Sequence, residues 1–187
     1  ALTIAEGLGE EGAEITTTCK NTIPTIMLSI AKDMIKASDF DGGLGQLAKV
    51  TETAELYGNA DVLAEANELV PGVYLSKGQA LLKAKDAAGA AAALQKAIEL
   101  DPTNGAGHLL YGQVLAASGK TAEAEAAYLK AAENGQEKNA NKQLSNMYLK
   151  LAQAALKAKK SQDAYDNATK ANSFLENANA YKIAASA

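Results

Sequence analysis

The amino-acid sequence predicts an all-α protein, a solenoid of about four helical hairpins closed by a C-terminal capping helix. Three observations predict this fold. The composition is rich in alanine, leucine, glutamate and lysine, which favours helix throughout. Apolar residues recur at helical spacing along most of the chain. Two stretches, which begin near Pro71 and Gly105, repeat one pattern with a period of about 34 residues, and such a period is typical of stacked helical hairpins.

Small and large residues occupy matching positions in the two repeats. Gly78 recurs as Gly112, and Ala97 recurs as Ala131. Helix axes approach closely only where no large side chain intervenes, so we expect these residues at the helix crossings. In the first repeat the second helix is expected to end before Pro102, because proline cannot continue a helix and disfavours the helical conformation of the residue before it.

The remaining hairpins follow from internal comparison. The stretch that begins at Pro24 aligns with the one that begins at Pro71, which predicts a further hairpin ahead of the two clear repeats. A stretch near Tyr148 aligns with the one near Tyr74, which predicts another hairpin behind them. We therefore expect a single domain over residues 1–187, with hairpins at about 20–57, 60–101, 105–135 and 139–172 and a capping helix at about 173–185.

Several boundaries depart from a plain repeat. Residues 59–70 and 139–144 are expected to extend the first helices of their hairpins toward the N-terminus. Pro71 would be either a kink or the first residue of a fresh helix. Asn134 and Gly135 are expected to stop a helix. Residues 1–13 are interpreted as a short helix or a frayed lead-in.

Both repeats resemble the tetratricopeptide repeat family. The first departs only at Lys77, where the family usually has leucine, and the second has Gln136 where proline is usual. The resemblance implies a right-handed α-α superhelix. It is carried by Tyr74, Gly78, Leu81, Ala90, Leu94, Ala97 and Pro102 in the first repeat and by His108, Tyr111, Gly112, Leu115, Ala124, Tyr128 and Ala131 in the second.

The resemblance also implies a concave groove lined by the first helix of each hairpin. The leucines would grip apolar groups, the glutamines could bond an extended backbone, and the lysines would favour acidic ligands. Alternatively, the leucines pack against neighbouring hairpins and the polar residues are merely solvated. Related proteins that clamp a chaperone's C-terminal carboxylate have lysine at the leucine positions, so that function is not implied. The candidate groove residues are Leu28, Lys32, Lys36, Leu75, Gln79, Lys83, Leu109, Gln113, Ala117, Leu149, Gln153 and Lys157.

Composition and charge argue against several classes of function. The formal net charge is −4 and acids and bases are interspersed, which argues against a nucleic-acid surface. All 18 basic residues are lysine, so no arginine is available for bidentate phosphate contacts. No apolar run is long enough to span a bilayer, so no membrane insertion is expected.

The sequence offers little for catalysis. The only histidine, His108, stands where neighbouring repeats have tyrosine, so we expect an aromatic filler rather than a metal ligand. Cys19 lies on an apolar helix face without an evident histidine base, so a nucleophilic role is not expected. Carboxylates such as Glu123 and Glu125 are interpreted as solvated helix faces. We expect no enzyme, metal or cofactor.

The favoured function is non-catalytic binding of a protein or peptide through the groove. One alternative is a structural or self-assembling component of a cell-envelope or surface complex, with a homodimer contact near residues 61–70 and 139–144. Another is an accessory domain of a larger enzyme or envelope complex. The chain begins at Ala1 without methionine, which fits a removed secretory signal or a removed tag. We expect an exported protein, periplasmic or on the cell surface, rather than a cytoplasmic one.

Overall fold

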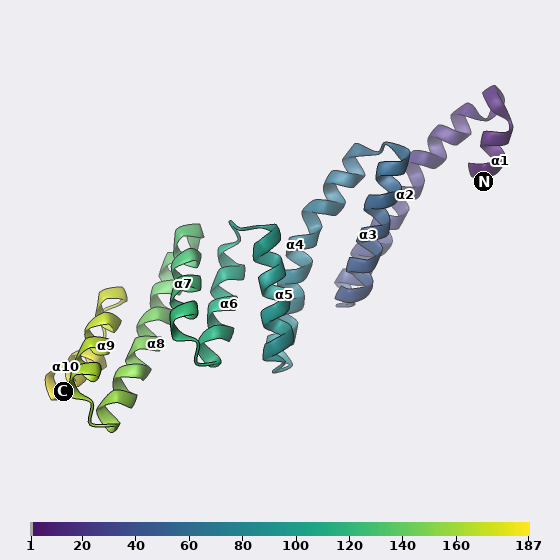
Figure 1. Cartoon of the computed structure of the whole chain (residues 1–187). Helices are drawn as coiled ribbons and strands as arrows, with labels where there is room; N and C mark the ends of the chain where they lie inside the picture. The colour runs from purple at the N-terminus through teal and green to yellow at the C-terminus, as the bar shows by residue number, and fades with distance from the viewer. Residues whose placement is uncertain (1) are drawn as a thin grey trace. The chain divides into compact units, whose positions relative to one another are not determined.

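The computed structural model describes residues 2–187, and within that range it contains ten α-helices, two short helical turns and no strand (Figure 1). The prediction of an all-α fold built from helical hairpins is confirmed. The chain divides into two compact units, Ala1–Lys77 (unit 1) and Gly78–Ala187 (unit 2), and the division falls inside one helix. That the four hairpins form one continuous domain stays a prediction.

Unit 1 begins with a short lead-in and continues with the first hairpin. Its elements are α1 (Leu2–Gly7), the turn η1 (Gly9–Gly12), α2 (Ala13–Lys36), α3 (Phe40–Tyr57) and the first part of α4 (Ala60–Lys83). The helix runs through Pro71, so the alternative that Pro71 begins a fresh helix is wrong, and the predicted extension before it is confirmed. The core consists of Leu28, Ala31, Leu47, Val50, Ala54, Val62, Ala66 and Val73.

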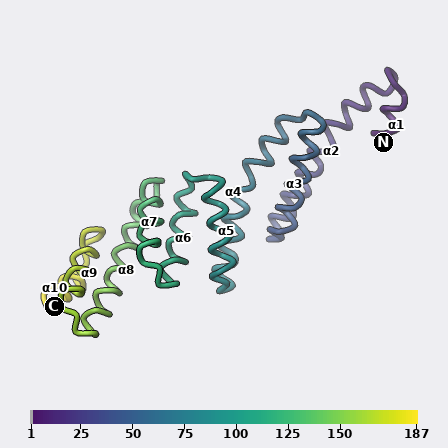
Figure 2. Tube along the Cα trace, in the orientation of Figure 1, coloured from purple at the N-terminus to yellow at the C-terminus, as the bar shows by residue number. Residues whose placement is uncertain are grey.

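Unit 2 holds the remaining helices, which follow one another as tightly connected hairpins (Figure 2). A non-helical residue at Asn134 and a left-handed one at Gly135 separate the third hairpin from the fourth, so the predicted stop is confirmed. The elements are α5 (Ala87–Leu100), α6 (Gly105–Ala117), α7 (Thr121–Ala131), η2 (Ala132–Gln136), α8 (Glu137–Lys157), α9 (Ser161–Phe174) and α10 (Ala178–Ser186).

The small residues of the repeat pattern lie at the helix crossings. A Cβ atom added to Gly112 would lie 2.7 Å from the Tyr128 ring, and one added to Gly78 would lie 2.6 Å from Leu94 Cγ. The same glycine-to-large-residue contact therefore recurs in both repeats, which supports the register read from the sequence. The alanines of the pattern in unit 2 are all fully buried, namely Ala90, Ala97, Ala124, Ala131, Ala152, Ala164 and Ala171.

The capping helix is shorter than predicted. The expected span began at residue 173, but α9 continues to Phe174 and α10 begins only at Ala178. The Asn177 side chain caps α10 by accepting a hydrogen bond from the Asn179 N–H at 2.9 Å. Ala180 and Ile183 of α10 are buried in the core of unit 2, so this helix covers the apolar end of the last hairpin.

Each hairpin turn uses a residue in the left-handed conformation. The φ angles are 65° at Ser38, 63° at Lys85, 76° at Gly119 and 58° at Lys159. The next residue is the N-cap of the second helix. In the first two turns this residue is an aspartate whose carboxylate accepts from a backbone N–H, whereas Lys120 and Lys160 provide no such cap.

Candidate functional site

Each unit contains a pocket between the first helices of two consecutive hairpins. In unit 1 a pocket of about 290 Å³ lies between α2 and α4, and it is called the unit 1 pocket below. In unit 2 a pocket of about 330 Å³ lies between α6 and α8, with the start of the α6–α7 turn at one end, and it is called the unit 2 pocket. Both lie on the side of the hairpins where the sequence predicted a groove.

The unit 1 pocket has apolar walls and lysines at its edge. Ile35, Leu69 and Val73 supply most of the wall. The Lys32 Nζ atom lies 2.5 Å from the Glu65 Oε1 atom, so its charge is already compensated within the unit. Lys36 lies exposed beside Asp33 at 3.8 Å. An apolar side chain fits these surroundings best. The lining residues are Lys32, Ile35, Lys36, Leu69, Gly72, Val73 and Ser76.

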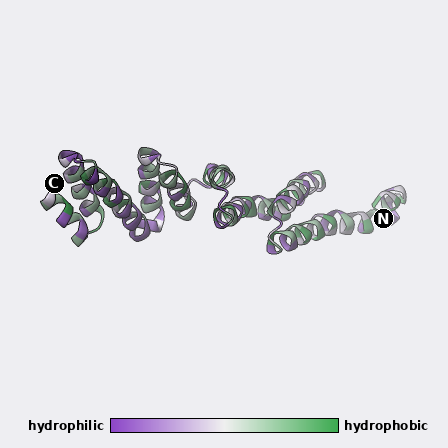
Figure 3. Ribbon diagram, turned by 90° about the horizontal axis from the view of Figure 1, so that it is seen from below, coloured by the Kyte–Doolittle hydropathy of each residue, from purple (hydrophilic) through white to green (hydrophobic). Residues whose placement is uncertain are grey.

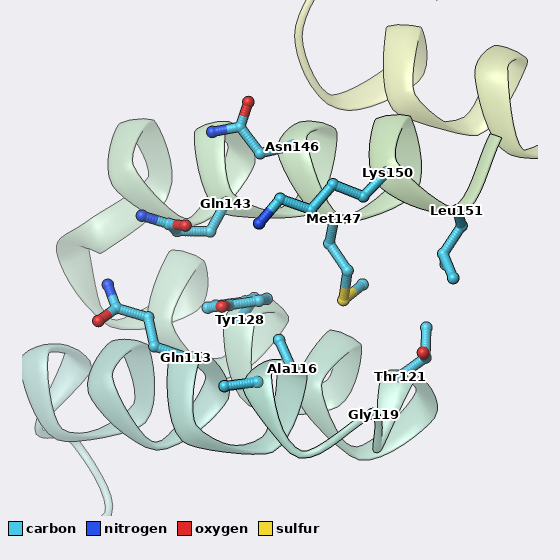
Figure 4. A pocket seen from close by; sticks show the side chains of 11 residues that line it. Gln113, Ala116, Gly119, Thr121, Tyr128, Gln143, Asn146, Met147, Lys150 and Leu151 are labelled. Atoms are coloured by element: carbon cyan, nitrogen blue, oxygen red, sulfur yellow. The ribbon is translucent and has the colours of Figure 1, made fainter. Parts of the chain in front are cut away.

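The unit 2 pocket is lined by more polar side chains (Figure 4). Gln113 comes from α6, Gln143 and Lys150 come from α8, and none of the three forms a hydrogen bond or ion pair within residues 2–187. In the view of Figure 4 their polar ends lie toward one end of the pocket, with Met147 and Leu151 toward the other. The full lining is Gln113, Ala116, Ala117, Gly119, Thr121, Tyr128, Gln143, Asn146, Met147, Lys150 and Leu151.

Tyr128 forms the floor of the unit 2 pocket. Its ring rests on Gly112, and the side chain as a whole is only 2% exposed. The hydroxyl makes no hydrogen bond to any part of the chain that the structure describes, although the residue lines the pocket. Burial raises the pKa of Tyr128 to about 12, so the hydroxyl stays neutral and can donate a hydrogen bond to a group in the pocket.

The structure places some of the predicted groove residues in these pockets. Lys32 and Lys36 line the unit 1 pocket, and Gln113 and Ala117 line the unit 2 pocket. Leu75, Leu109 and Leu149 are half-buried, and the last two pack against the core of unit 2. The other predicted residues are exposed and line neither pocket, namely Gln79, Lys83, Gln153 and Lys157.

Leu28 requires a correction. It is 3% exposed and belongs to the core of unit 1, so it presents no surface to a partner. Leu28 shares this core with residues of α3 and α4, in line with the alternative that the leucines pack against neighbouring helices, and helical periodicity alone could not decide between the two. Conversely, the sequence did not indicate Tyr128, Gln143 or Lys150 as residues of the groove. The available signal was the spacing of Gln143, Met147 and Lys150, which places them on one face of α8.

A second polar cluster lies on α7, α8 and α9 of unit 2. The Tyr148 hydroxyl donates to Glu125 Oε2 at 2.6 Å, and Lys170 Nζ lies 2.7 Å from Glu125 Oε1. Lys170 Nζ also lies 4.5 Å from the centre of the Tyr148 ring, which stacks on Phe174. Glu125 is therefore a partly buried member of a cluster, which corrects its interpretation as a solvated carboxylate.

The cluster shifts the pKa values of its members. Burial raises the pKa of Glu125, but hydrogen bonds from Lys170 and Tyr148 outweigh it and hold that pKa below its ordinary value. Burial and the hydrogen bond to Glu125 raise the pKa of Tyr148. The hydrogen bond to Glu125 raises the pKa of Lys170. All three groups thus keep their bonded forms near neutral pH, as expected of a structural element.

The residues considered for chemistry occupy structural positions. The half-buried His108 donates through Nε2 to the Pro102 carbonyl oxygen at 3.0 Å, which fixes the turn before α6. Cys19 is a half-buried free thiol on α2. Among residues 2–187, no group of three or more His, Cys, Asp or Glu side chains is placed to hold a metal ion. Over the same range, every helix is too short or too polar to cross a bilayer.

Comparison with known proteins gives the following similarities. Two family models of the tetratricopeptide repeat match residues 30–105 and 81–147, which together span more than half of the chain. The chain is similar to the crystal structure of PilW, a widely conserved type IV pilus biogenesis factor, with 19% identity, a TM-score of 0.43, and 88% of this chain and 86% of that chain covered. It is also similar to YrrB, a tetratricopeptide repeat protein with an unusual peptide-binding site, with 15% identity, a TM-score of 0.42, and 86% and 91% covered. No curated protein matches the chain.

Proposed function

Because this chain belongs to the tetratricopeptide repeat family, we propose that it is a non-catalytic scaffold that binds a protein or peptide partner through the first helices of its hairpins. The observation that carries the proposal is the pair of open pockets on those helices. Each has the size of a side chain or a short stretch of peptide rather than of a large cofactor.

The chemistry of the two pockets supports peptide binding. A peptide offers apolar side chains, carboxamides and charged groups at regular spacing, and the pockets present an apolar wall in one unit and hydrogen-bond donors in the other. The exposed lysines Lys36 and Lys150 at the pockets add a preference for acidic partners.

Affinity purification from the native organism, followed by mass spectrometry, tests the proposal. The bait is the whole chain, and the test variant carries Lys36→Glu and Lys150→Glu, one charge reversal at each pocket. Both side chains are exposed, so the helices should remain intact by circular dichroism. A partner that the wild-type chain captures should be lost by the variant.

A matched control keeps the net charge of the variant and moves the changes elsewhere. Lys49→Glu and Lys96→Glu place the same reversals on the exposed surfaces of α3 and α5, the second helices of their hairpins. Capture should survive in this control. If the control loses the partner as fully as the test variant, binding depends on overall charge or on another surface, and the proposal is wrong.

A second candidate function is self-association. Ile4 on α1, Leu8 just after α1, and Ile15, Ile26 and Ile30 on α2 are all exposed by 44% or more, and Figure 3 shows hydrophobic residues along the N-terminal part of α2. The homodimer contact that the sequence suggested near residues 61–70 and 139–144 has less support than this exposed N-terminal surface. There Val62, Ala66, Ala140 and Leu144 are buried within their own units.

Size exclusion with light scattering tests self-association. A dimer that persists on dilution and dissociates in an Ile26→Gln, Ile30→Gln variant would favour it. A monomer at all concentrations would leave partner binding as the better function.

A further inference from the structure

We propose that the unit 2 pocket binds the carboxylate of a glutamate side chain from an acidic peptide segment of the partner, with Lys150 and Tyr128 as its principal contacts. This inference rests on the proposed function and names the chemistry of one of its sites. Neither contact residue was among the groove residues expected from the sequence, and each lines the pocket from a different helix.

Charge complementarity favours an anionic group. Lys150 is the only charged residue among those that line the pocket, and no carboxylate does so. It forms no ion pair within residues 2–187, in contrast to Lys32 at the unit 1 pocket and to Lys170 in the polar cluster with Glu125. A carboxylate beside Lys150 would therefore meet an uncompensated positive charge.

The hydrogen-bonding groups of the pocket also lack partners. The Tyr128 hydroxyl belongs to a side chain that is almost entirely buried, has no hydrogen bond within the described chain, and lines the pocket. The side-chain amides of Gln113 and Gln143 are likewise unpaired. A neutral hydroxyl, two amides and an ammonium group can together donate to both oxygens of a carboxylate.

The walls of the pocket suit a glutamate side chain, and the volume accommodates it together with the neighbouring peptide backbone. A volume of about 330 Å³ lies at the lower end of the range for ligand pockets. Met147, Leu151 and Ala116 provide apolar contacts for methylene groups, while the donors lie at the other end. A single lysine and the absence of arginine from the chain match one negative charge better than the double charge of a phosphate.

The test uses capped pentapeptides and the whole chain in nuclear magnetic resonance titrations. The probe is acetyl-Gly-Ala-Glu-Ala-Gly-amide, and the neutral match carries glutamine in place of glutamate. We expect saturable shifts of the Met147 methyl signal with the glutamate probe. The glutamine peptide should bind at least fivefold more weakly, and added salt should weaken the glutamate probe, since the contact is ionic.

Variants test the two principal contacts. Lys150→Met should raise the Kd of the glutamate probe at least fivefold, whereas Lys142→Met, at an exposed lysine of the same helix outside the pocket, should leave it unchanged. Tyr128→Phe keeps the ring that packs on Gly112 and removes only the hydroxyl, so the Kd should rise about two- to tenfold.

Four results would overturn the assignment. Equal binding of the glutamine peptide would show that the carboxylate is not recognised. Preference for a glutamine peptide with a free C-terminus would show that the pocket takes a chain end, and preference for a phosphoserine peptide would show that it takes a phosphate. The fourth result is a glutamate probe that does not bind although the wild-type chain captures a partner that the Lys36→Glu, Lys150→Glu variant loses. That result overturns this inference and leaves the proposed function standing.

Discussion

The two pockets occupy equivalent places in their hairpins but differ in chemistry. The unit 1 pocket has apolar walls, and Lys32 at its edge is paired with Glu65. The unit 2 pocket has a tyrosine floor, unpaired amides and the uncompensated charge of Lys150. The repeat therefore supplies the place of the site, since in each unit the pocket lies between the first helices of two consecutive hairpins. The residues outside the repeat pattern supply its specificity.

The difference extends to the way each unit is held together. Unit 1 relies on its apolar core and on exposed ion pairs. One of these pairs joins Lys77 to Asp41, which accounts for a lysine at a position where the repeat usually has leucine. Unit 2 has a larger apolar core and, in addition, the partly buried cluster of Glu125, Tyr148 and Lys170. The two units should consequently respond differently to substitution and to pH.

The largest expected effect comes from the two cores. Leu47→Ala in unit 1 and Leu144→Ala in unit 2 remove fully buried side chains, and each should lower the free energy of unfolding by about 2–5 kcal/mol. Hydrogen exchange read by mass spectrometry should show the loss of protection concentrated in the unit that carries the change. Equal loss in both units for either variant would show that they unfold as one body.

Two glycines give the next largest contrast, namely Gly112 beneath the Tyr128 ring in unit 2 and Gly72 in the lining of the unit 1 pocket. Gly112→Ala would place a Cβ atom 2.7 Å from the Tyr128 ring, so unit 2 should lose about 1–2 kcal/mol even after the gain in helix propensity. Gly72→Ala meets nothing within 4 Å and lies inside α4, so it should stabilise by about 0.5–1 kcal/mol. Chemical denaturation measures both. Stability changes of opposite sign would support tight packing at Gly112 and open space at Gly72, and changes of equal sign would contradict this difference.

The polar cluster predicts a response to pH that is specific to unit 2. Tyr148→Phe removes a hydrogen bond to a carboxylate and should cost about 1–2 kcal/mol at neutral pH. The pKa of Glu125 is lowered from 4.5, so its contribution is present above that value and is lost as the pH falls through the folded pKa. The pKa values of Tyr148 and Lys170 are raised, so their contributions are lost as the pH rises above about 10.

Unfolding curves at pH 3, 7 and 10.5, read by hydrogen exchange in α7–α9, would check this response. The difference between wild type and Tyr148→Phe should shrink toward both extremes, since pH 3 lies below the ordinary carboxyl pKa and pH 10.5 lies above the ordinary tyrosine pKa, so the stabilisation by the cluster is declining there. A constant difference across the three values would show that the hydroxyl contributes only through packing.

The smallest expected effect concerns the hairpin turns. Asp39 caps α3 with a hydrogen bond from the Gly42 N–H at 3.0 Å, whereas Lys120 holds the same backbone position before α7 without a cap. Lys120→Ser would form a capping box with Glu123 and should stabilise unit 2 by about 0.5–1 kcal/mol. Asp39→Ala should destabilise unit 1 by a similar amount. Melting temperatures that move the same way in both variants would contradict the comparison.

The sequence by itself determined the helices, the repeat register and the places where helices stop. Gly78 and Gly112 were recognisable because only a missing side chain permits so close a helix crossing, and the structure puts a large residue against each. Gly135 and Pro102 were recognisable because backbone conformation at these residues is a local property. Local sequence carries this information regardless of what packs nearby.

Only the tertiary structure decided which helix faces stay open and which polar groups meet. Leu28 is buried while Lys36 is exposed on the same helix. The sequence could not distinguish them, because helical periodicity shows which residues share a face but not which neighbour covers that face. Tyr128, Gln113 and Lys150 come together from three helices, so no spacing in the sequence connects them. A site built across helices depends on their packing, and packing is settled by the whole unit rather than by any one segment.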